Sequence, residues 1–65
     1  MTTANERYNS VLRTHEFLKE LMWDKDLTEE IRTKAYRCIK HYPWDCHMED
    51  VAEKCPEIFE NRSEV

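Results

Sequence analysis

The chain has 65 residues, a formal net charge of −4, no glycine, two prolines and three cysteines. A chain of this length has a thin core and little room for a supported catalytic cleft, so we do not expect an enzyme. Without glycine the tight turns of a β-rich protein are hard to form, whereas the many Glu, Lys, Arg, Leu and Met residues favour helix.

We therefore predict an all-α protein, with an antiparallel helical hairpin and a short third helix forming a small three-helix domain over residues 1–65. The apolar spacing places the helices at residues 6–23, 28–42 and 45–55, and residues 61–65 are predicted to form a frayed tail. No signal-peptide pattern opens the chain, and no apolar run approaches the roughly 18 residues that a membrane span needs. We expect a cytoplasmic protein with reduced thiols and no membrane association.

The first predicted helix has Thr3 or Asn5 as its candidate N-cap, since either side chain accepts a hydrogen bond from a free backbone amide. Its main apolar stripe follows spacings of three and four residues, which place side chains on one helical face. That stripe consists of Tyr8, Val11, Leu12, His15, Leu18 and Met22.

A second apolar strip lies on a different side of this helix, where Phe17 and Leu21 are one turn apart. A helix with two apolar sides has two partners, and a thin core gains from self-association, so we predict a homodimer formed through this helix. A monomer at high micromolar concentration would contradict that prediction. We interpret His15 as a half-buried histidine bonded to a tyrosine or a carbonyl, with a pH-sensitive interface contact as the alternative.

The second predicted helix follows a connector of about four to five residues, a length typical of an antiparallel hairpin. Asp26 with Glu29 three residues later fits a capping box, and Thr28 is the competing N-cap. Pro43 disfavours the α conformation of the residue before it and so ends the helix. The predicted apolar face comprises Ile31, Ala35, Cys38, Ile39 and Tyr42.

The third predicted helix is short and has Asp45 as its expected N-cap. Pro56 stops it, or else opens a last turn at its first position with Glu57 behind it. Ile58 with Phe59 then offers an apolar hook. The apolar stripe of this helix comprises Trp44, Met48, Val51, Ala52 and Cys55.

Four short motifs occur in a fixed order between residues 6 and 56. They are Glu6-Arg7, Glu16-Phe17-Leu18, Arg32 with Ala35, and His41-Tyr42-Pro43. In this order and spacing the chain resembles a family of short proteobacterial proteins to which no activity is assigned. The resemblance implies a helical fold and a bacterial source but no function, and the three cysteines are not part of its pattern.

Cysteine and histidine side chains gather in the second half of the chain, where a zinc-stabilised module is one alternative function. The candidate ligands are Cys38, His41, Cys46, His47 and Cys55. No Cys-x-x-Cys pair is present, and Cys38 and Cys55 lie on apolar stripes, where cysteine acts as a small buried hydrophobe. We therefore expect no metal or other cofactor, a buried Cys38 and Cys55, and an exposed Cys46 thiol.

One basic face runs along the second helix, and it supports a DNA-binding regulator as the other alternative. It comprises Lys34, Arg37, Lys40 and His41. Residues 43–65 carry seven acidic and two basic side chains, and their net charge of −5 would repel the same duplex. Nucleic acid is therefore not the expected partner.

The aromatic residues are the strongest indication of function. Two Trp, three Tyr and two Phe are more than a bundle of this size buries, and exposed Trp and Tyr are favoured anchors of protein interfaces. The residues predicted to bind a partner are Phe17, Leu21, Trp23, Tyr36 and Trp44. We predict a small protein-interaction or regulatory module, and the sequence does not indicate which protein it binds.

Overall fold

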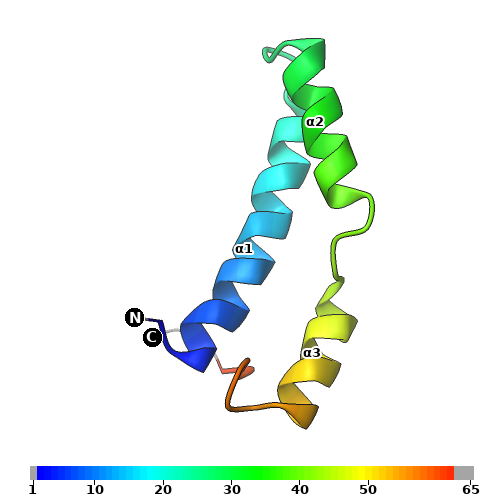
Figure 1. Cartoon of the computed structure of the whole chain (residues 1–65). Coiled ribbons are helices and arrows are strands. Elements are labelled where there is room, and N and C mark those ends of the chain that lie inside the picture. Colours follow the sequence, from blue (N-terminus) through cyan, green and yellow to red (C-terminus); the bar gives the residue numbers. More distant parts are fainter. Residues whose placement is uncertain (1, 63–65) are drawn as a thin grey trace. The chain divides into compact units, whose positions relative to one another are not determined.

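The computed structural model describes residues 2–62, and within them it contains three helices and no strand (Figure 1). Helix α1 spans Ala4–Trp23, α2 spans Glu29–Ile39 and α3 spans Asp45–Lys54. The predicted all-α fold, with α1 packed against α2 in a hairpin and a short third helix, is confirmed. Most of the predicted tail lies outside the described residues.

The chain divides into two compact units. Unit one comprises Met1–Leu12 and Pro43–Val65, of which residues 2–12 and 43–62 are described, and unit two comprises Arg13–Tyr42. Helix α1 contributes its first half to unit one and its second half to unit two. That the whole chain is a single domain stays a prediction.

Helix α1 begins with a reciprocal capping box. The Glu6 amide donates to Thr3 Oγ1 over 3.1 Å, and the Thr3 amide donates to Glu6 Oε1 over 2.8 Å. Of the two predicted N-caps Thr3 is therefore correct, and the helix starts two residues earlier than expected because the box uses Glu6 as its third residue.

The capping box makes the carboxyl of Glu6 more acidic, and this gives a testable pH dependence. The Thr3 amide and then the Thr3 hydroxyl lower the Glu6 pKa from its ordinary value of 4.5. Because folding lowers this pKa, the ionised Glu6 carboxylate stabilises the folded state at pH values above the unfolded pKa. That stabilisation is lost as the pH falls through the folded pKa. In a carboxyl-detected NMR titration we expect Glu6 to titrate below 4.5, and Thr3→Ala to raise its midpoint.

The matched control for that titration is Thr33→Ala, which removes an exposed threonine hydroxyl from α2 instead. It should leave the Glu6 midpoint unchanged. A Glu6 midpoint at or above 4.5 in the unmodified chain would contradict the capping box.

In unit two, residues 24–28 join α1 and α2 into an antiparallel hairpin (Figure 1). The Ile31 amide donates to Thr28 Oγ1 over 3.3 Å, so Thr28 is the N-cap. The alternative capping box on Asp26 is wrong, because the backbone amide of Asp26 is itself held in the turn by Asp24 Oδ1 at 2.9 Å.

The buried side of α2 is rotated relative to the predicted apolar face. Ala35 is buried and Ile39 is half-buried, but Ile31 and Cys38 are exposed. The half-buried Arg32 lies on the covered side instead, since it is three residues before Ala35 and seven before Ile39. The prediction that Cys38 is a core residue is therefore wrong, because α1 contacts the neighbouring side of α2.

Helix α2 ends at Ile39, three residues before the predicted end at Tyr42. The last turn tightens, because the Tyr42 amide donates to the Ile39 carbonyl over 3.1 Å and Pro43 disfavours a helical Tyr42. The ring of Tyr42 stacks on His15 of α1 with centroids 5.6 Å apart. His15 is half-buried, as predicted, and its contact with the tyrosine is ring stacking. The predicted hydrogen bond of His15 to a tyrosine or a carbonyl stays a prediction.

At the start of α3 a histidine side chain, and not the predicted aspartate, binds a free backbone amide. Trp44 is the N-cap residue, and its backbone amide donates to Nδ1 of His47 over 2.9 Å. Asp45 is already the first helical residue, so its predicted role as N-cap is wrong by one position. The helix ends before Pro56, as predicted.

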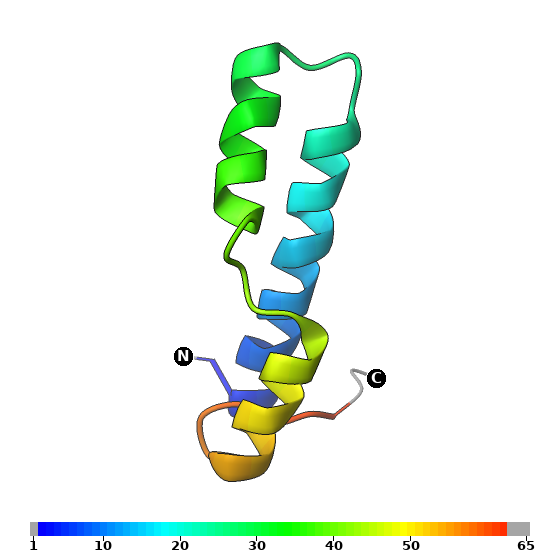
Figure 2. The ribbon, with the colours of Figure 1, turned by 90° about the vertical axis from the view of Figure 1, so that its right-hand side faces the viewer.

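The core of unit one forms where α3 packs against the first half of α1 (Figure 2). Its buried members are Tyr8, Met48 and Ala52, and partly buried Val11, Leu12 and Phe59 pack against them. Burial, reinforced by the charges of Glu49 and Asp45, raises the pKa of the Tyr8 phenol above 10.0. Two residues of the predicted α3 stripe, Trp44 and Val51, are exposed, because this short helix is covered along one narrow line.

Backbone carbonyls of residues 57–62, which we call the C-terminal strap, accept hydrogen bonds from the start of α1. Arg7 Nε donates to the Ile58 carbonyl over 2.9 Å, and Asn5 Nδ2 donates to the carbonyls of Glu60 and Arg62. The Glu60 amide donates in return to the Ala4 carbonyl over 3.1 Å. The strap therefore holds Phe59 of the predicted apolar hook against the core.

Candidate partner-binding pocket

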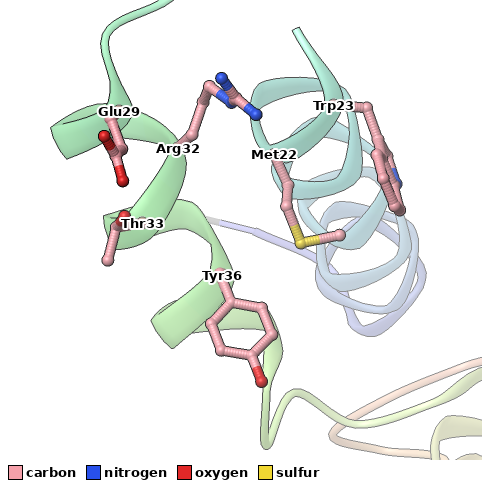
Figure 3. A pocket seen from close by; sticks show the side chains of 6 residues that line it. All are labelled: Met22, Trp23, Glu29, Arg32, Thr33 and Tyr36. Atoms are coloured by element: carbon pink, nitrogen blue, oxygen red, sulfur yellow. The ribbon is translucent and has the colours of Figure 1, made fainter. Parts of the chain in front are cut away.

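An open pocket of about 330 Å³ lies in unit two, at the end of the hairpin nearest its connector (Figure 3). We call it the aromatic pocket. It is lined by Met22, Trp23, Glu29, Arg32, Thr33 and Tyr36.

Each lining residue is positioned by one of the two hairpin helices. Met22 and Trp23 end α1, and Arg32 and Tyr36 lie one turn apart on α2, where residues four apart share a face. The cap on Thr28 sets where α2 begins and so fixes which of its residues lie beside the end of α1. The connector and the register of α2 against α1 therefore determine which residues line the pocket.

Two aromatic residues that line the pocket are open to solvent. The exposed fraction is 73% for Trp23 and 51% for Tyr36. Figure 3 shows the Met22 thioether between α1 and the Tyr36 ring. A flexible thioether beside an exposed ring makes a surface that adapts to a partner side chain.

Arg32 is the polar residue of the pocket whose hydrogen bonding is incomplete. Its Nε is buried and has no hydrogen-bond partner among the described residues. In Figure 3 its guanidinium extends from α2 toward the end of α1, whereas the carboxylate of Glu29 lies on the other side of α2. A buried donor without an acceptor destabilises the free protein, and an acceptor supplied by a ligand would remove that cost.

The structure brings together only two of the five residues predicted to bind a partner. Trp23 and Tyr36 line the same pocket, but Phe17, with 56% of its area exposed, and half-buried Leu21 are not among its lining residues. Trp44, 64% exposed, belongs to unit one. Sequence reasoning missed Arg32 in the pocket, although its spacing of four residues from Tyr36 is a readable signal.

The predicted basic face is exposed along its whole length, with Lys34, Arg37, Lys40 and His41 all open to solvent. Lys34 forms an ion pair with Glu30 over 3.4 Å, and Glu29 and Glu30 line a second open pocket, of about 420 Å³, together with Thr33, Lys34 and Arg37. These carboxylates reduce the positive potential that a nucleic-acid phosphate would meet. The DNA-binding alternative stays a prediction.

The cysteine and histidine candidates are divided between the two units. Cys38 and His41 belong to unit two, whereas Cys46, His47 and Cys55 belong to unit one. Within residues 2–62 no three His, Cys, Asp or Glu side chains are grouped as a metal site would require. The Cys46 thiol is exposed, as predicted, and Cys55 is only half-buried. The zinc-stabilised alternative stays a prediction.

Comparisons with family models, curated proteins and solved structures give no match. The resemblance to short proteobacterial proteins accordingly stays a prediction. Within residues 2–62 no helix is both long enough and apolar enough to cross a membrane.

Proposed function

We propose that the protein is a small interaction module that binds a segment of a partner protein in the aromatic pocket. The observation that carries this proposal is that Trp23 and Tyr36, both exposed, are among the residues that line one pocket. Trp and Tyr contribute large contact areas at low entropic cost, and they dominate the energetics of protein interfaces.

The rest of the chain supports a binding role rather than a catalytic one. The side chains buried in residues 2–62 are few and mostly small, so a supported catalytic constellation has little material to rest on. An interface needs less, because a few anchors in a rigid frame supply most of its free energy. The hairpin provides that frame, and Trp23 and Tyr36 are its anchors.

The test is affinity capture from a bacterial lysate with mass spectrometry, followed by binding measurements on the purified partner. We expect Trp23→Ala and Tyr36→Ala each to weaken the complex by about 30-fold, since interface anchors cost about 2 kcal/mol or more on truncation. Circular dichroism should show both variants folded, because these side chains are exposed.

Two comparison variants decide whether the pocket is the binding surface. Val51→Ala truncates an exposed apolar side chain of unit one and should leave affinity unchanged. Phe17→Ala combined with Leu21→Ala tests the second apolar strip of α1. If the double variant loses the partner while the pocket variants keep it, the binding surface is the strip and the proposal is wrong.

A further inference from the structure

We infer that the partner segment is acidic and that a Glu or Asp side chain in it accepts hydrogen bonds from Arg32. This inference rests on the proposed function, because it names the chemistry that the aromatic pocket recognises. The starting point is the buried Nε of Arg32, which has no partner among the described residues.

A carboxylate is the group that fits this donor. The planar guanidinium presents pairs of N–H groups that match the two oxygens of a carboxylate, and such charge-assisted pairs are stronger than neutral hydrogen bonds. A carboxylate that draws the guanidinium into the pocket would give Nε an acceptor that it lacks in the free chain. The guanidinium has to turn toward the pocket for this, and the hydrogen bond that Nε then forms replaces none that it makes in the free chain.

The two acidic side chains in the first turn of α2 do not fill this role. Glu30 is paired with Lys34 over 3.4 Å, and the carboxylate of Glu29 lies away from the guanidinium of Arg32 in Figure 3. Glu29 nevertheless lines the pocket, so it would repel a doubly charged phosphate more strongly than a singly charged carboxylate.

The architecture also favours an acidic side chain over the carboxylate of a chain terminus. Chain termini are held by nests of free backbone amides. The amides of Met22, Trp23, Thr33 and Tyr36 lie inside helices, and the Arg32 amide donates to the Thr28 carbonyl over 3.1 Å. Glu29 is the first residue of α2, so its amide lies outside the helical hydrogen-bond pattern, but a single amide does not form a nest. Apolar neighbours of the acidic residue would contact the apolar lining of the pocket, as expected of an acidic-apolar peptide.

Three synthetic tripeptides test the inference directly by NMR titration of the intact chain. They are acetyl-Leu-Glu-Leu-amide, its neutral isostere acetyl-Leu-Gln-Leu-amide, and acetyl-Leu-Gln-Leu with a free terminal carboxylate. We expect the Glu peptide to shift the Trp23 indole N–H and the Arg32 Nε–H, and to bind about 10-fold to 100-fold more tightly than the other two.

Arg32→Gln should remove the preference for the Glu peptide, and Arg32→Lys should restore it only in part because an ammonium lacks the paired donors. The matched control is Arg37→Gln, which makes the same charge change on α2 outside the pocket and should keep the preference. The comparison of Glu and Gln peptides on the unmodified chain needs no variant, so it stands even if a substitution disturbs folding.

Several results would overturn the inference. Equal binding of the Glu and Gln peptides, equal loss in Arg32→Gln and Arg37→Gln, tightest binding of the free terminus, or no shift at millimolar peptide would each do so. A dimer in sedimentation that Arg32→Gln dissociates would instead identify a second copy as the occupant. If both peptides bind equally and Trp23→Ala abolishes both, the proposed function survives while the acidic partner does not.

Discussion

Tyr8→Ala should abolish the cooperative folding of unit one. Tyr8 is the largest buried side chain of that core, with 4% of its area exposed, and it packs with Met48 and Ala52. Removing a buried aromatic ring costs about 3–5 kcal/mol. A core in a domain below about 70 residues supplies about the same amount in total, so little stability would be left.

The measurement is thermal unfolding by circular dichroism together with an amide NMR spectrum. We expect Tyr8→Ala to lose helical signal, with the amides of α3 collapsing toward random-coil positions. Phe17→Ala is the control, because it truncates an exposed aromatic of the same helix and should change stability by no more than about 0.5 kcal/mol. A variant at Tyr8 with an unchanged midpoint would show that the core does not depend on the ring.

Asn5→Asp should release the C-terminal strap at neutral pH. Asn5 is the buried polar residue of unit one, with 7% of its area exposed, and its amide donates to the carbonyls of Glu60 and Arg62. A carboxylate of the same shape donates no hydrogen bond and would face two carbonyl oxygens, at a cost of about 2–3 kcal/mol. Favourable interaction with the helix N-terminus offsets only about 0.3–1 kcal/mol of this.

Hydrogen exchange of the Glu60 amide reports the state of the strap, because that amide donates to the Ala4 carbonyl over 3.1 Å. We expect its protection to fall in Asn5→Asp and to recover in part in acid, where the protonated aspartate again has a donor. Asn61→Asp places the same charge on an exposed strap residue and should leave protection intact. Equal loss in both variants would mean that charge alone, and not the buried amide, loosens the strap.

Local chemistry is what made the helices predictable. Thr28 caps α2 through a bond to an amide three residues away, and Pro43 restricts its immediate neighbour, so both signals act within one turn. The errors at Asp45 and at the end of α2 are also local, since they concern which of several neighbouring residues completes a turn. The residues of the main α1 stripe are all buried or half-buried, and their burial was equally predictable from the periodicity of the sequence.

What the sequence determined by itself is therefore the all-α class, the hairpin and the surplus of exposed aromatic residues, because spacing, caps and composition act over a few residues. Only the tertiary structure decided which side of α2 is covered, and with it the exposure of Cys38 and the position of Arg32 in the aromatic pocket. It also decided that Asn5 binds carbonyls more than 50 positions away. These outcomes depend on the rotation of one helix against another and on long-range contacts, which a linear pattern of polar and apolar residues does not encode.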